Sequence, residues 1–238
     1  MNEEGGWSVR RILVVFLVAL AALTACKTGT PVPTEPPSVV PTPISPISPI
    51  SPLPSESPLA VPEAPERTWA ALLVIAPSDF NDTEYSEPRA IFEEAGYAVQ
   101  VASLSMEVAR GMHGTEVQPD LALSDVDVAN YDTVVFVGGS GSVALWDDEE
   151  VHRVAREAVE QGRVLAAICL APMALARAGV LEGREVTMFD AEDYRPELEA
   201  QGAICTGEVV ERDGRIVTAS GPQAADQFAE TIVEVLQE

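Results

Sequence analysis

Cys169 is the residue whose type and surroundings most clearly favour chemistry. It follows an apolar run, Val164 to Ile168, that predicts a strand covered on both faces, and Pro172 fits the first turn of a helix just beyond it. Ala167 and Ala171 give the pattern small-x-nucleophile-x-small, with cysteine in place of serine. Such a turn pushes the side chain into the open, and the helix start favours a thiolate. The alternative is an inert cysteine that fills the core.

The elements that must position this cysteine alternate between strands and helices. Predicted strands cover residues 70–76, 97–102, 133–137 and 164–168, and predicted helices cover 87–95, a segment that starts with the acidic residues 147–150, and 223–236. A hairpin joins 208–211 to 215–218 around Asp213-Gly214. This alternation predicts an α/β three-layer sandwich with a mainly parallel sheet in a single domain, residues 69–238.

The first 26 residues predict export, because Arg10 and Arg11 precede an apolar core over residues 12–22. The stretch is too short for a comfortable membrane span. Its end, Leu23-Thr-Ala-Cys26, resembles the bacterial lipoprotein cleavage box, in which the cysteine is lipidated and becomes the new N-terminus. We therefore expect a lipid on Cys26, a protein anchored to the membrane of the bacterial cell envelope, and a domain on the extracytoplasmic side. An uncleaved anchor and an ordinary secretory cleavage are the alternatives.

Residues 27–68 have a composition that cannot form a packed core. They hold 13 of the 19 prolines, including a Pro-Ile-Ser repeat over residues 43–52. Such a segment favours the extended polyproline II conformation, which over about 40 residues reaches up to ~100 Å. The sequence predicts a stalk between the anchor and the domain.

The domain over residues 69–238 is strongly acidic. It holds 32 acidic and 10 basic side chains, a formal charge of −22, and no lysine. Polyanions are repelled by such a surface, so nucleic acid and anionic lipid are poor partners for the domain, and no nucleic acid is expected to bind.

Four separated segments resemble the ThiJ/PfpI family in their order and spacing. They are Asp79-Phe-Asn-Asp-Thr-Glu84, Val135-Phe-Val-Gly-Gly139, Ala167-Ile-Cys-Leu-Ala-Pro172 and Val217-Thr-Ala-Ser-Gly-Pro222, spread over residues 70 to 237. The family includes the parkinsonism-associated deglycase and intracellular protease I. The resemblance implies the flavodoxin-like, class I glutamine amidotransferase-like form of the sandwich, and homodimers are common in the family.

For the site, the resemblance implies a reactive Cys169, a glutamate at position 84 that contacts it, and an oxyanion pocket formed by the backbone N–H groups of Gly139 and Leu170. The residue types agree with this pairing. A glutamate in an apolar pocket beside a sulfur resists ionisation, so Glu84 would act as an acid/base or stabilise a thiolate. The alternative is a solvated carboxylate in an acidic loop.

The histidine on which proteolytic and amidotransferase-like members depend is missing from both of its usual positions. The position directly after the cysteine is Leu170, and the position on the strand after the elbow helix is assigned, by its spacing from Val186, to Phe189. The two histidines of the chain, His113 in a predicted loop and His152 on a solvated helix face, are expected away from the site. A complete Cys-His-acid triad is therefore not expected, which disfavours peptidase activity.

Cofactor and metal motifs are weak. Gly139-Ser-Gly-Ser-Val-Ala144 resembles a dinucleotide fingerprint, but the next strand ends in Cys169 without the acid that binds a ribose. The three cysteines lack metal-ligand spacing, so no cofactor and no metal are expected. Cys205 either pairs with Cys169 in an oxidising compartment or fills the core, and the core is favoured.

Two functional classes follow from the sequence. The first is an enzyme of glyoxalase or deglycase type, in which Cys169 attacks a small reactive carbonyl or its protein adduct and Glu84 moves the proton. The second is a non-enzymatic binding, chaperone-like or redox-responsive module at the cell surface that has lost the triad. Retention of Cys169 and Glu84 favours the first class, whereas Leu170 and Phe189 favour the second.

Overall fold

The structure, a computed structural model, describes residues 69–190 and 194–238. The predicted signal peptide over residues 1–26, the lipidated Cys26 and the stalk over 27–68 lie outside the described residues. Among the helices of the described part, none is long and apolar enough to cross a membrane.

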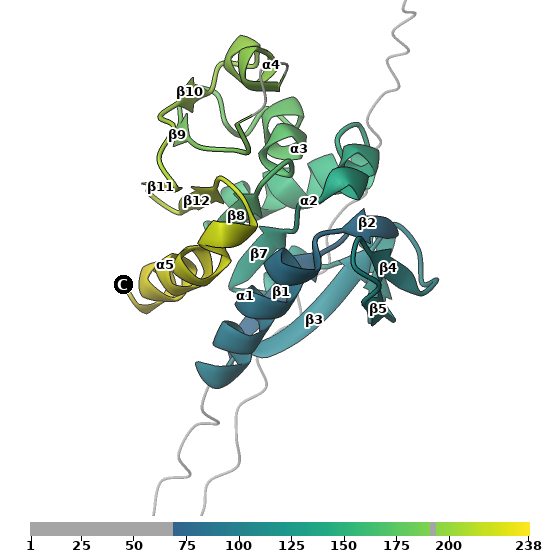
Figure 1. The fold of residues 1–238 in the computed structure, drawn as a ribbon. Helices are drawn as coiled ribbons and strands as arrows, with labels where there is room; N and C mark the ends of the chain where they lie inside the picture. The colour runs from purple at the N-terminus through teal and green to yellow at the C-terminus, as the bar shows by residue number, and fades with distance from the viewer. Residues whose placement is uncertain (1–68, 191–193) are drawn as a thin grey trace, which may run out of the picture. The chain divides into compact units, whose positions relative to one another are not determined.

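A seven-stranded sheet forms the centre of the domain (Figure 1). Its strands run in the order β11 (Val210–Asp213), β12 (Ile216–Ala219), β8 (Val164–Ile168), β7 (Thr133–Phe136), β1 (Ala70–Val74), β3 (Ala98–Ser103) and β6 (Leu121–Ala122). Neighbouring strands pair in parallel, except that β11 and β12 are antiparallel. The predicted α/β fold with a mainly parallel sheet is therefore confirmed.

Helices cover the sheet. The described α-helices are α1 (Asp82–Glu94), α2 (Glu149–Glu160), α3 (Pro172–Arg177), α4 (Tyr194–Ala200) and α5 (Ala225–Gln237). Helices α1 and α5 pack on each other, with α1 on β1 and β3 and α5 on β8 and β12, while α2 packs on β7 and β8. Every residue of β7 and β8 is buried, as expected for apolar parallel strands covered on both faces.

Short elements complete the domain, and apart from the strand at Val186 the sequence did not predict them. One small sheet joins β2 (Ser78–Phe80), β4 (Ala109–Gly111) and β5 (Glu116–Val117), and another joins β9 (Glu185–Val186) and β10 (Ile204–Cys205). The 3₁₀ helices are η1 (Leu123–Asp125), η2 (Val128–Asn130), η3 (Ser140–Leu145) and η4 (Pro222–Ala224). Segments this short carry no readable hydrophobic period.

The prediction that the first helix starts at residue 87 is wrong, since α1 starts at Asp82. The physical reason is an N-cap at Asn81, whose side-chain oxygen accepts the N–H groups of Thr83 (3.0 Å) and Glu84 (3.2 Å). Pro88 therefore lies inside α1, whereas the predicted start at residue 87 placed it in the first turn. This correction moves Glu84 from a loop into the first turn of a helix.

The end of the chain follows the prediction more closely. The hairpin is confirmed, with β11 paired to β12 around a turn in which Gly214 has a φ of +63°. The last helix starts at Ala225 and not at Gln223, because the chain first makes the 3₁₀ turn η4.

Candidate active site

Cys169 lies at a strained elbow between β8 and α3. Its φ is +62°, a left-handed value that residues other than glycine rarely adopt. Its N–H donates to the carbonyl of Ala219 (2.9 Å), and its own carbonyl accepts the N–H of Phe189 (2.9 Å). These two bonds hold the strained turn in place on both sides.

The expectation that the elbow pushes the cysteine into the open is wrong, since the Cys169 side chain is only 7% exposed. The turn directs it against the end of β7 and the start of α1. A Cβ placed on Gly138 would lie 2.6 Å from the Cys169 Cβ and 2.5 Å from the Glu84 Oε2. Gly138 therefore occupies the narrow space between the two side chains, and only a glycine fits there.

Glu84 is fully buried and faces the Cys169 thiol. Its Oε2 accepts the N–H of Gly138 (3.0 Å). Among the described residues, no hydrogen-bond partner is found for its Oε1. The alternative of a solvated loop carboxylate is therefore wrong. The first turn of α1 places the carboxyl in the interior because the Asn81 cap fixes where that turn begins.

Two backbone N–H groups point at the Cys169 sulfur, those of Gly139 and Leu170. They are the two groups that the family resemblance implied for an oxyanion pocket. Gly139 has a φ of +100°, and a Cβ on it would lie 2.4 Å from the Asn81 nitrogen. The close approach of its N–H to the site thus requires glycine.

The pKa values of the two side chains describe a coupled pair. Burial raises the pKa of the Cys169 thiol to about 12, and the charge of Glu84 adds to this rise against the two N–H groups that lower it. Burial also raises the pKa of Glu84 to about 7, although the thiol and the Gly138 N–H lower it. The pair releases its first proton near neutrality and its second in strong alkali.

The expectation that a helix start favours the thiolate is accordingly wrong for the resting protein. Helix α3 has six residues and starts three positions after Cys169, so its dipole is small at the sulfur. Desolvation and the neighbouring carboxyl outweigh it.

The Asn81 cap yields a prediction about the position of Glu84. We expect Asn81→Ala to lower the free energy of unfolding by about 1 kcal/mol and to slow Cys169 alkylation, because the first turn of α1 loses its anchor. Asp148→Ala is a matched control, since Asp148 caps α2 through the N–H groups of Glu150 (2.9 Å) and Val151 (3.1 Å). Urea denaturation and peptide mapping of alkylated protein measure both effects. Equal alkylation of the two variants would show that the cap does not position Glu84.

The histidines have other partners. The backbone N–H of His113, an exposed residue after β4, donates to Asp82 (2.8 Å), and the ring Nε2 of His152 bonds to the carbonyl of Trp146 (2.7 Å). His152 is half-buried and thus less solvated than the sequence predicted. The Phe189 side chain is 45% exposed beside the elbow and supplies no base.

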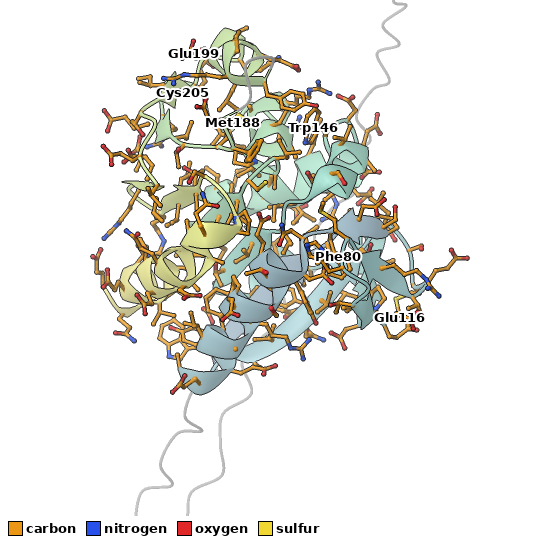
Figure 2. All side chains as sticks on the ribbon, viewed as in Figure 1. Phe80, Glu116, Trp146, Met188, Glu199 and Cys205 are labelled. Carbon is orange, nitrogen blue, oxygen red and sulfur yellow. The ribbon has the colours of Figure 1, made fainter. Side chains whose placement is uncertain are left out.

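Cys205 is half-buried, packs against the core and is not in a disulfide. Together with Met188 it belongs to the region around β9, β10 and α4, where Figure 2 labels both. Both line a cavity of about 190 Å³ that adjoins the elbow through Phe189 and Ser220; its other lining residues are Thr187, Asp190, Arg195 and Gly207.

Sequence reasoning missed Asn81 and Gly138 as parts of the site. Each had a signal: Asn81 is followed three residues later by Glu84, a helix-start pattern, and Gly138-Gly139 directly follows a buried strand.

Within residues 69–190 and 194–238, no group of three or more His, Cys, Asp and Glu side chains could hold a metal ion.

Comparison with known proteins finds relatives similar in sequence and in fold. An uncharacterized protein of Methanocaldococcus jannaschii is 36% identical over 167 residues, which cover 70% of this chain and 82% of that protein. Deglycase TK1284 of Thermococcus kodakarensis is 30% identical over 166 residues, 70% of this chain and 99% of the deglycase. The crystal structure of a ThiJ/PfpI domain protein from Brachyspira murdochii has a TM-score of 0.69 at 35% identity and covers 72% of this chain and 98% of that one. Residues 70–235 match the DJ-1/PfpI family model, and the chain belongs to the DJ-1/PfpI family.

Proposed function

We propose that Cys169 and Glu84 act together on small reactive carbonyl compounds or their protein adducts, as a glyoxalase or deglycase does. The observation that carries this proposal is the buried Glu84 carboxyl against the Cys169 thiol, with two N–H groups directed at the sulfur. A thiol, a proton-transfer group that titrates near neutrality and fixed N–H donors are the parts that addition to a carbonyl needs. Relatives named as deglycases support the same reaction class.

In the proposed reaction the Cys169 sulfur bonds to the aldehyde carbon of an α-oxoaldehyde. Glu84 takes the thiol proton and passes it to the carbonyl oxygen, on which the N–H groups of Gly139 and Leu170 stabilise the developing charge. Glu84 then removes the proton on the bonded carbon and returns it to the neighbouring carbon through an enediol, so the adduct isomerises to a thioester. One water hydrolyses the thioester, which releases a 2-hydroxy acid and restores the thiol.

Access to the sulfur favours a small substrate over a peptide. Cys169 is 7% exposed, which leaves little room for a bulky substrate at its sulfur. A peptide bond would need an open groove to reach the sulfur. Without a histidine near the thiol, the acid/base steps fall to Glu84.

Turnover assays test the proposal directly. Purified wild-type protein, Cys169→Ala and Glu84→Gln are compared for loss of methylglyoxal with formation of lactate, for ammonia release and for peptide cleavage. We expect lactate formation by the wild type alone and no peptide cleavage. Lactate formation that persists in Cys169→Ala would contradict the proposal.

A non-enzymatic, redox-responsive or binding module is the second candidate. Phe189 favours it, because the family resemblance places a histidine at this position and the phenylalanine side chain supplies no base. A folded protein that turns over none of the substrates, but whose Cys169 reacts in a Glu84-dependent way, would support this candidate over the enzyme.

We also propose that the chain is an exported lipoprotein, on the strength of Leu23-Thr-Ala-Cys26 behind Arg10 and Arg11. Mass spectrometry of protein expressed in a bacterium should find an N-terminus at Cys26 that carries lipid. Retention of residues 1–25, or cleavage that leaves Cys26 unmodified, would rule this out.

A further inference from the structure

We infer that Trp146 is a positioning residue that holds the backbone of the Cys169 elbow in its working geometry. The inference rests on the proposed function, because it assigns Trp146 to the same site. Trp146 is 4% exposed, and its indole Nε1 donates to the carbonyl of Leu170 (3.0 Å). Leu170 is the residue whose N–H points at the sulfur.

The carbonyl and the N–H of Leu170 flank a single Cα. Anchoring the carbonyl therefore restricts the backbone rotation that would turn the N–H away from Cys169. An N–H directed at the sulfur favours the thiolate, and at Cys169 this N–H lowers the pKa of the thiol. The indole thus acts on the sulfur through Leu170, without touching it.

One short segment positions both N–H groups. The turn η3 begins directly after Gly139, the other N–H donor, and ends directly before Trp146. The segment packs closely on Ser78, because a Cβ on Gly141 would lie 1.7 Å from the carbonyl oxygen of that residue. It therefore links the residue that carries one N–H donor to the indole that holds the backbone of the other.

The indole ring is itself held from outside the site. The Arg177 guanidinium lies 5.1 Å from the ring centroid, and the Tyr194 ring packs edge-on at 5.1 Å and 84°. Arg177 in turn donates to Asp147 (2.7 Å) and Glu197 (3.0 Å). Figure 2 labels Trp146 in this region, next to α3. The ring therefore cannot turn its N–H away from Leu170 without breaking these contacts.

Trp146→Phe tests the inference, since phenylalanine keeps a ring but lacks the N–H. We expect the variant to alkylate about three- to tenfold more slowly in mildly alkaline buffer, with the alkaline limb of its pH profile shifted upward, because one net hydrogen bond is lost. The inflection near neutrality that belongs to Glu84 should remain. Trp69→Phe is the matched control: Trp69 precedes β1, at the opposite end of the strands from Cys169, and should leave the profile unchanged.

A folded Trp146→Phe protein with the wild-type profile would overturn the inference. A second measurement uses the wild-type protein and needs no stable variant at position 146. In its ¹⁵N spectrum, with the Trp69 indole signal assigned through Trp69→Phe, alkylation of Cys169 should shift the Trp146 indole N–H and leave that of Trp69 in place. An unshifted Trp146 signal overturns the inference. Alkylation needs no turnover, so both results are independent of whether methylglyoxal is a substrate.

Discussion

Replacement of Glu84 by alanine should slow the alkylation of Cys169 by iodoacetamide in mildly alkaline buffer about 10²-fold. In the wild type the rate should rise with an inflection at about pH 7, because burial raises the pKa of Glu84 to about 7 and its carboxylate can then accept the thiol proton. The alanine variant has no such base. Its rate should rise only where the thiol itself ionises, and peptide-level mass spectrometry over a pH series measures this.

The alkaline end of the same profile should move in the opposite direction. The charge of Glu84 raises the pKa of Cys169, so removing that charge should lower the alkaline step of the variant below the wild-type value of about 12. Glu84→Gln is the control, because it keeps the shape of the side chain but cannot accept the proton. It should lose the inflection near neutrality as well. Persistence of that inflection in either variant would identify another group as the base.

Gly138→Ala should destabilise the domain strongly and dismantle the site. The new Cβ would meet three groups at once: Glu84 Oε2 at 2.5 Å, Cys169 Cβ at 2.6 Å and the carbonyl oxygen of Ile168 at 2.6 Å. Overpacking of this kind costs about 1–3 kcal/mol or more. Urea denaturation should show this loss, and Cys169 alkylation should lose its dependence on Glu84.

Gly96→Ala separates a clash from backbone strain. Gly96 has a φ of +86° but nothing within 4 Å of a new Cβ, so alanine there costs about 1–2 kcal/mol of conformational energy alone. It should leave the pH profile of Cys169 alkylation unchanged. If Gly138→Ala leaves that profile unchanged too, Gly138 does not separate Glu84 from the thiol.

The central strands and the elbow were predictable from local sequence. The runs that form β7 and β8 are apolar at every position except Thr133, as is typical of strands buried on both faces, and Ala167 and Ala171 mark a crowded turn around Cys169. Asp213-Gly214 likewise specified the hairpin of β11 and β12, because the turn needs a left-handed residue.

The environment of Glu84 was not predictable from its neighbours in the sequence. Asp79, Asp82 and Glu87 around it are exposed or half-exposed, so the local pattern is that of a solvated loop. Burial of this one carboxyl depends on the Asn81 cap and on Gly138. Gly138 follows β7 and lies 54 positions after Glu84 in the chain. Only the tertiary structure joins them.

The exposure of Cys169 was mispredicted for a related reason. A sharp turn fixes where the side chain points, but the residues that it points at come from β7 and α1. Those residues cover the sulfur and raise the pKa of its thiol, an effect that no feature of residues 164–172 contains.

Direct titration of Glu84 tests the coupled pair most simply. In protein labelled with ¹³C at the glutamate side-chain carboxyls, one signal, identified by its loss in Glu84→Gln, should titrate at about pH 7 in the wild type. The thiol lowers the pKa of Glu84, so Cys169→Ala should move this titration to higher pH. Titration of Glu84 near the ordinary value of 4.5, or the same titration with and without the Cys169 thiol, would contradict a buried carboxyl coupled to the cysteine.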